Sequence, residues 1–144
     1  TTFYFRNIAY TQFKYMEATL DGGIVNTAHN NGHSVRTDQP VSAGGQNSAP
    51  TPFELFLASI GTCAGIFVKS FCDQRGLSAE GIKIIHDAEY DMQTGLPSSI
   101  TIDIKVPADF PEQYIPALVH VADLCKVKKT ITAQPQMSVT SSKI

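Results

Sequence analysis

The sequence has no tryptophan and only three cysteines among 144 residues. An odd, low cysteine count argues against a secreted domain held by disulfides, so a reducing cytoplasm is the expected location. There is no Cys-x-x-Cys pair and no Asp-rich loop. A structural zinc site is therefore not predicted, and no metal or bound cofactor is expected.

An excess of charge of one sign is also missing. Eleven basic and thirteen acidic side chains leave a net charge of −2, so nucleic acid is not a predicted partner. The first residues, Thr1–Arg6, lack a basic start followed by an apolar run, and no secretory signal is predicted. The 42% hydrophobic content fits one globular domain over residues 1–144.

The N-terminal part of the chain predicts β-structure with two hairpin turns. Apolar and aromatic residues are scattered through 13–20, and Asp21-Gly22 and Asn31-Gly32 are typical turn pairs. These turns predict a three-stranded meander. The Gly- and Ser-rich stretch 42–50 is expected to be a flexible loop.

A long helix is predicted to begin after that loop. Thr51 suits the N-cap, Pro52 the first helical position and Glu54 the third, which together form a capping box. The apolar pattern continues to about Gly76, a natural C-terminal glycine. The segment approaches the ~20 residues that span a bilayer. Its charged ends, Glu54 and Lys69, and its internal glycines favour a buried core helix, so no membrane is predicted as partner.

Apolar residues lie on every side of this helix, so one sheet alone cannot cover it. Its second side needs another helix or another subunit. The Gly61-x-x-x-Gly65 spacing would let a second helix approach closely. We therefore expect a homodimer with apposed central helices.

Two strands and a helix are predicted next. The strands cover 82–90 and 100–106, and the second alternates strictly between apolar and polar residues. The helix runs from about Pro111 to Leu124, with Pro116 marking a kink or a late start.

A short turn of helix after Cys125 and a last strand near 137–140 complete the prediction. Strands and helices come in blocks rather than in strict alternation, which favours the α+β class. The expected architecture is a β-meander and a second antiparallel set of strands, packed on a long central helix.

Cys63 lies in the middle of the long apolar helix. A free cysteine commonly packs as a small hydrophobe, which is one interpretation. Its small neighbours Thr62 and Ala64 would also leave room for a substrate, which is the other. Cys72, half a turn out of phase, is expected to pack or to lie at the surface near the helix end.

Cys125 is the thiol that the local sequence marks as reactive. Lys126, Lys128 and Lys129 follow it, and a helix N-terminus is expected there. Both features favour the thiolate and would lower the pKa of Cys125 below the usual ~8.5. The alternative is a cysteine that ends a helix beside solvated lysines.

Glu54 and Arg36 are the charged candidates for a site. Glu54 is also explained by the capping box, and Arg36 by a solvated position on a strand. Nothing singles out one of the four histidines as the base of a Cys–His hydrolase.

Two motifs carry a resemblance to a known family. Ala49–Cys63, which contains Pro-Phe-Glu-Leu-Phe-Leu-Ala followed by Ser-Ile-Gly-Thr-Cys, resembles the start of the central helix in the OsmC/Ohr superfamily. Ala122–Ile131 resembles the second-cysteine block of that superfamily. The separation of Cys63 and Cys125 by 62 positions (125 − 63) also matches. The resemblance covers nearly the whole chain and is to a less-characterised branch.

The resemblance implies a thiol-dependent peroxidase on an intertwined α+β homodimer, with active sites at the interface. In such proteins the first cysteine, here Cys63, attacks the hydroperoxide and becomes a sulfenic acid. The second, here Cys125, then condenses with it to a disulfide. An external dithiol, typically a lipoyl group on a protein, reduces the pair. An apolar approach to Cys63 would favour organic and fatty hydroperoxides.

Three positions depart from the family pattern. Phe53 stands where well-studied members have a glutamate that, paired with an arginine, activates the first thiol, and Glu54 is one position later. Arg36 is the nearest upstream arginine, outside a matching motif, and Lys126 replaces a proline. Two rival functions stay open: a non-catalytic redox sensor and a binder of apolar small ligands. A cysteine hydrolase would cleave esters without peroxide.

Overall fold

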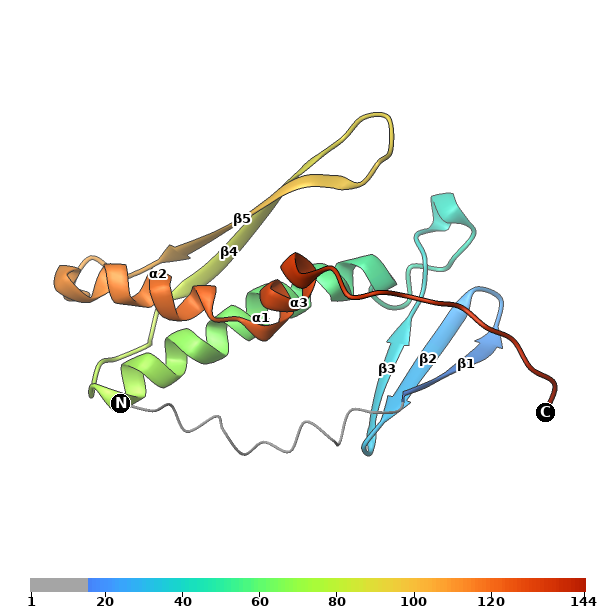
Figure 1. Cartoon of the computed structure of the whole chain (residues 1–144), viewed down its shortest axis with the longest axis horizontal. Coiled ribbons are helices and arrows are strands. Elements are labelled where there is room, and N and C mark those ends of the chain that lie inside the picture. Colours follow the sequence, from blue (N-terminus) through green and yellow to red (C-terminus); the bar gives the residue numbers. More distant parts are fainter. Residues whose placement is uncertain (1–15) are drawn as a thin grey trace. The chain divides into compact units, whose positions relative to one another are not determined.

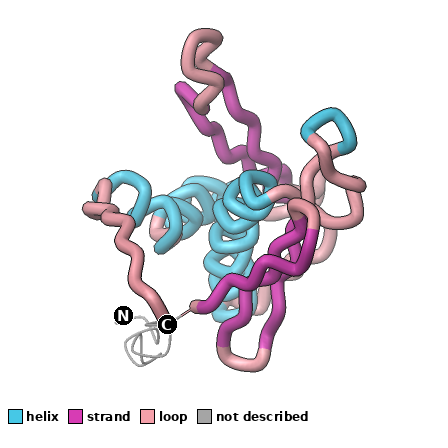
Figure 2. The backbone as a smooth tube through the Cα atoms, turned by 90° about the vertical axis from the view of Figure 1, so that its right-hand side faces the viewer, coloured by secondary structure: helices cyan, strands magenta, loops and turns pink. Residues whose placement is uncertain are grey.

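The computed structural model of the chain describes residues 16–144. Three strands, a long helix, two further strands and two shorter helices follow one another in the order expected from the sequence (Figure 1). Helices and strands form separate blocks along the chain, which confirms the α+β class (Figure 2). The chain divides into two compact units, one ending at Phe56 and the other running over Leu57–Ile144.

The first unit contains the predicted meander. Strands β1 (Glu17–Gly22), β2 (Val25–Asn30) and β3 (His33–Thr37) form an antiparallel sheet in the order β1-β2-β3. Asn31 and Gly32 join the last two strands with φ angles of 53° and 80°. Two successive left-handed residues are what a two-residue hairpin turn requires, so the Asn-Gly signal is confirmed. The expectation for residues 13–15 lies outside the described part of the chain.

The expectation of a flexible loop over 42–50 is wrong. The Asp38 side chain is 1% exposed, and its carboxylate accepts hydrogen bonds from the backbone N–H groups of Gln39, Gln46 and Ser48 at 2.7, 3.2 and 2.9 Å. The Ser48 hydroxyl donates a fourth, at 2.6 Å. One carboxylate thus ties both ends of the loop together, and the short 3-10 helix η3 (Val41–Ala43) lies between them.

Gly45 sits inside this loop at a point of close approach. A Cβ added there would lie 2.0 Å from the backbone oxygen of Gln39 and 2.7 Å from Asp38 Oδ1. The loop therefore needs a residue without a side chain at this position, because the obstacle is backbone that cannot rotate away.

The long helix α1 (Pro52–Gln74) begins as predicted. The Thr51 hydroxyl accepts a hydrogen bond from the Glu54 N–H at 3.1 Å, and the Glu54 carboxylate accepts one from the Thr51 N–H at 2.7 Å. This reciprocal pair is the capping box. At the other end Gly76 adopts a φ of 65°, and the Leu77 N–H donates to the Cys72 carbonyl at 2.9 Å. The predicted glycine C-terminus is confirmed.

The second unit contains an antiparallel hairpin and two short helices. Strands β4 (Lys83–Tyr90) and β5 (Pro97–Lys105) pair along their whole length. Along β5 the side chains of Ile100, Ile102 and Ile104 are half-buried, whereas the residues between them are exposed. The predicted alternation is confirmed.

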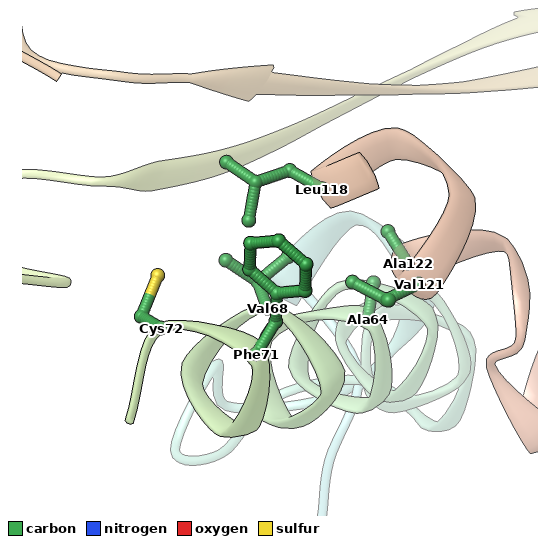
Figure 3. Close-up of a cluster of buried hydrophobic side chains, with 7 residues drawn as sticks. All are labelled: Ala64, Val68, Phe71, Cys72, Leu118, Val121 and Ala122. Atoms are coloured by element: carbon green, nitrogen blue, oxygen red, sulfur yellow. The ribbon is translucent and has the colours of Figure 1, made fainter. Parts of the chain in front are cut away.

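The core of this unit joins α1 to α2 (Ile115–Asp123), as Figure 3 shows. Leu118 of α2 is fully buried and faces the side chains that α1 contributes. The isoleucines of β4 and β5 pack against the same cluster. The buried members are Ala64, Val68, Phe71, Cys72, Leu118, Val121 and Ala122.

Gly61 and Gly65 of α1 are covered by a strand of the same chain. A Cβ at Gly61 would lie 3.4 Å from His86 Nδ1, and one at Gly65 would lie 3.7 Å from Ile84 Cγ1. Within the chain, the close approach that these glycines permit is made by β4. The homodimer stays a prediction.

The C-terminal third confirms one expectation and corrects another. Of the kink and the late start left open at Pro116, the late start is confirmed: a 3-10 turn, η4 (Glu112–Tyr114), precedes α2, and Pro116 lies in the first turn of α2. The last strand, near 137–140, is absent, since residues 134–144 have no regular structure. The Met137 and Val139 side chains are 93% and 99% exposed, and a strand needs a partner along its edge.

Among the described residues, α1 is the one helix long and apolar enough to cross a membrane by length and composition. This is weak evidence, because the core helix of a soluble protein passes the same test.

Candidate functional site

Cys125 occupies the N-cap of α3 (Lys126–Ala133), between two helices. Its sulfur accepts a hydrogen bond from the Lys128 N–H at 3.4 Å, and its thiol points to the Ile60 carbonyl of α1 at 4.0 Å. The predicted turn of helix after Cys125 is confirmed, and it extends over eight residues.

The expectation that the lysines and the helix N-terminus lower the pKa of Cys125 below its usual value is wrong. Cys125 is 0% exposed. Burial raises the pKa of its thiol, the hydrogen bond with Cys63 raises it further, and the N–H groups of Lys128 and Val127 lower it. Burial wins because water no longer solvates the thiolate. The ammonium group of Lys128 pairs with Asp123, so its charge is not directed at the sulfur.

Cys63 lies on α1, three residues after Ile60. Its side chain is partly exposed and hydrogen-bonds the Cys125 side chain. Both thiols are free. The structure therefore brings together the two cysteines that the sequence separates by 62 positions (125 − 63), and it gives them different access to solvent.

Cys72 is not part of this pair. It is fully buried in the core, where burial and the neighbouring Asp73 raise the pKa of its thiol. Of the two expectations for Cys72, packing and a surface position, the structure supports packing.

Glu54 and Arg36 belong to the first unit. The Glu54 carboxylate is engaged by Thr51, whose hydrogen bonds lower the pKa of that carboxyl group. Arg36 is exposed on β3 opposite Thr27. The pKa of the Asp21 carboxyl is lowered chiefly by hydrogen bonds from Thr27 and Thr19, and the charge of Arg36 adds a small part. The structural role of Glu54 is thus confirmed, and a catalytic role of either residue stays a prediction.

An apolar pocket of about 570 Å³ lies in the second unit, next to residues that contact Cys125. Strand β5 forms one wall and helices α2 and α3 form the other. Two residues that line the pocket, Ile60 and Ala122, also contact Cys125. The Cys125 thiol points to the Ile60 carbonyl, and the Cys125 N–H donates to the Ala122 carbonyl at 3.2 Å. The Asp123–Lys128 ion pair and Ser98 supply polar groups at the pocket.

The sequence analysis missed three parts of this site. The Ile60 carbonyl and the Lys128 N–H are main-chain groups, which no side-chain pattern marks. The Asp123–Lys128 ion pair spans the break between α2 and α3, so helical spacing does not reveal it.

No group of three His, Cys, Asp or Glu residues in the described part of the chain could hold a metal ion. His29 and His33 are four residues apart in sequence, but they lie on different strands, and His29 Nδ1 is 3.0 Å from the Ser34 hydroxyl.

The sequence of the chain matches a known family. Residues 45–140 match the family of OsmC-like proteins. The chain belongs to this family. The resemblance seen in the two cysteine motifs is confirmed at the family level. A search of the curated proteins finds no match.

Solved structures support the fold of this OsmC-like chain. A protein from Psychrobacter arcticus 273-4, provisionally assigned to osmotic stress and detoxification, has a TM-score of 0.69 at 18% identity, with 80% of this chain and 85% of that chain covered. The OsmC-like protein from Mycoplasma pneumoniae has a TM-score of 0.67 at 12% identity, covering 83% and 87%. An organic hydroperoxide resistance protein OsmC from Legionella pneumophila has a TM-score of 0.52 at 16% identity, covering 81% and 87%. At these identities the likeness establishes the fold alone.

Proposed function

We propose that this OsmC-like protein is a thiol-dependent peroxidase that reduces organic hydroperoxides. The observation that carries the proposal is the juxtaposition of Cys63 and Cys125, one partly exposed and one buried. Two adjacent thiols can perform two-electron redox chemistry without a bound cofactor. The name of the Legionella relative, an organic hydroperoxide resistance protein, supports the choice of oxidant.

Cys63 is the peroxidatic thiol in this proposal, because its sulfur is the one that a substrate can reach. Its thiolate attacks one oxygen of the hydroperoxide, the O–O bond breaks, and an alcohol and a Cys63 sulfenic acid form. The Cys125 sulfur then attacks the Cys63 sulfur, and water leaves as the disulfide forms. An external dithiol, such as a lipoyl group on a partner protein, takes up the oxidising equivalents and regenerates both thiols.

The apolar pocket supports fatty or aromatic hydroperoxides as substrates. Its lining is mainly aliphatic. Of its three charged members, Asp123 and Lys128 pair with each other, and Asp103 pairs with Lys105. An apolar peroxide gains binding energy there by burying its chain, whereas hydrogen peroxide has no chain to bury. Glu54 and Arg36 stay the charged candidates for the site, and the Glu54 carboxylate also caps α1.

We also propose that the protein is cytoplasmic and a homodimer with active sites at the interface. The α1 side chains of Phe53, Phe56 and Ile66 are 40%, 38% and 56% exposed, which supports a partner surface on this helix. Sedimentation at micromolar concentration tests the assembly, and a stable monomer would reject it.

The pocket also favours a second candidate, a non-catalytic binder of apolar ligands or a redox sensor. One assay separates it from the enzyme: consumption of cumene hydroperoxide with dihydrolipoamide as reductant. The wild type is expected to turn over many times, and Cys63→Ser to be inactive. Cys125→Ser is expected to stop at the sulfenic acid after one equivalent. A wild type no faster than Cys63→Ser would reject the peroxidase.

A further inference from the structure

The Cys125 sulfur is held by main-chain groups of two helices. The Lys128 N–H donates to it from the first turn of α3, and the Ile60 carbonyl accepts from it on α1. The Lys128 N–H is one of the helix-start donors that have no partner within the helix itself. The sulfur at the N-cap therefore takes the place that a serine or aspartate oxygen usually fills.

The two sulfurs differ in their access to a third thiol. Thiol–disulfide exchange requires the incoming thiolate to reach a sulfur of the disulfide directly. Cys63 is partly exposed, whereas Cys125 is 0% exposed. An external thiolate therefore reaches Cys63, and Cys125 is the sulfur that leaves.

We propose that the Lys128 backbone N–H stabilises Cys125 as the leaving thiolate, which places the mixed disulfide with the reductant on Cys63. This rests on the proposed function, because it assigns a Cys63–Cys125 disulfide as the species that the reductant meets. Lys128 acts here as a positioning residue through its main chain.

The electrons and protons balance as follows. A thiolate of the reducing dithiol bonds to Cys63, the Cys63–Cys125 bond breaks, and Cys125 takes the electron pair. The second thiol of the reductant then attacks the reductant sulfur that is bonded to Cys63. Cys63 leaves with an electron pair, the reductant closes to a cyclic disulfide, and its two protons end on Cys63 and Cys125.

The burial of Cys125 makes the donor necessary. Burial raises the pKa of this thiol, and the N–H groups of Lys128 and Val127 oppose that rise. A sulfur with a raised pKa is a poor leaving group, so each donor that favours the thiolate speeds its departure. The Lys128 ammonium is engaged by Asp123, so the group that Lys128 offers to the sulfur is its main-chain N–H.

Lys128→Pro tests the main-chain donor, and Lys128→Ala is its matched control. Both lose the ion pair with Asp123, but only proline removes the N–H. The position is in the first turn of α3, where the missing N–H breaks no bond within the helix. Each protein is oxidised with diamide, which forms the disulfide without any peroxidase activity, and is then reduced by dihydrolipoamide in a stopped-flow experiment.

Lys128→Pro is expected to be reduced about tenfold more slowly than Lys128→Ala, the order expected for a lost hydrogen bond to a charged group. The difference in reduction rate between the two variants is expected to become smaller when a more reactive reducing thiol is used. Equal rates for the two variants would overturn the proposal, as would failure of diamide to link Cys63 to Cys125.

A second variant avoids proline. Native chemical ligation at Cys125 joins residues 1–124 to a synthetic peptide 125–144 in which the Lys128 N–H is replaced by an ester oxygen. The ligated all-amide chain is its control. The ester chain is expected to show the same slower reduction, and an unchanged rate would overturn the proposal.

The position of the mixed disulfide is tested in the wild type. Diamide-oxidised protein is treated with the monothiol 2-mercaptoethanol, quenched with N-ethylmaleimide in denaturant so that the buried Cys125 thiol is also labelled, and mapped by peptide mass spectrometry. The adduct is expected on Cys63 with the maleimide on Cys125, and the reverse pattern would overturn the proposal. If peroxide forms no disulfide while diamide and the mapping give these results, the peroxidase fails and the exchange mechanism stands.

Discussion

The loop around Asp38 and the core beneath α2 are stabilised in opposite ways. The loop depends on one buried carboxylate that accepts four hydrogen bonds, and on one glycine that leaves room for the backbone. The core depends on seven apolar side chains that pack against one another. The strength of a hydrogen bond depends on its direction and on the charge of its partners. The free energy of packing, in contrast, changes gradually with side-chain volume. The two regions therefore respond differently to mutation and to pH.

Removing a large side chain from the core is expected to have the largest effect. Leu118→Ala leaves a cavity at a fully buried position and is expected to lower the free energy of unfolding by about 2–5 kcal/mol. Urea denaturation measures the change. Val119→Ala is the matched control, since Val119 is 58% exposed on the same helix. Equal losses for the two variants would contradict the placement of the core.

A single methyl group in the Asp38 loop is expected to come next. Gly45→Ala places a Cβ against the Gln39 carbonyl and is expected to cost about 1–3 kcal/mol, because the backbone must shift. Ser42→Ala, at an exposed position of the same loop, serves as control. A Gly45→Ala variant as stable as the wild type would mean that the loop is not held as described.

The helix cap next to this loop gives a smaller effect. Thr51→Ala removes the acceptor of the Glu54 N–H and is expected to cost about 1 kcal/mol. Thr62→Ala makes the same chemical change in the middle of α1, where the hydroxyl donates back to the carbonyls of Ala58 and Ser59. The urea midpoint of Thr51→Ala is expected to be lower than that of Thr62→Ala. A larger loss of stability for Thr62→Ala would argue against the capping box.

The effect of pH is confined to acid conditions. The hydrogen bonds from Ser48, and then those from Gln39 and Gln46, hold the pKa of Asp38 well below its usual value. The folded state therefore binds a proton less readily than the unfolded state, whose aspartates titrate near 3.9. The stabilisation is fully present above about pH 5, begins to fall near the unfolded pKa and is lost as pH falls further through the lower pKa of the folded state.

Urea midpoints for the wild type and Asp38→Asn, measured from pH 7 to pH 3, check this expectation. Other carboxyl groups with lowered pKa values, among them Asp91 and Asp123, contribute to both proteins equally. The wild type is expected to lose more stability on acidification than Asp38→Asn. Parallel curves would show that the loop does not depend on the carboxylate charge.

Local signals in the sequence predicted the parts of the fold that depend on neighbouring residues. The Thr51–Glu54 capping box, the Asn31-Gly32 turn and the alternating isoleucines of β5 are all within one turn or one strand. Each of them was predicted correctly because the physical cause lies within a few positions of the chain.

The errors concern contacts between distant residues. Asp38 binds Gln46 and Ser48 across a loop whose composition alone indicates flexibility. Cys125 is buried against Ile60, which is 65 positions away, while its sequence neighbours are lysines. The residues at 137–140 have the composition of a strand, but a strand also needs an edge to pair with. In the site, the pairing of Cys63 with Cys125 came from the family resemblance, since neither setting alone identifies the partner.

The position of Cys72 makes its thiol a natural probe for opening of the core. Its thiol is fully enclosed between α1 and the neighbouring core residues, so a maleimide can label it only while the core is open. When Cys63 and Cys125 are joined as a disulfide, Cys72 is the one thiol left, and no label has to be engineered. The labelling rate, divided by that of the unfolded chain, then reports how often the core opens under native conditions.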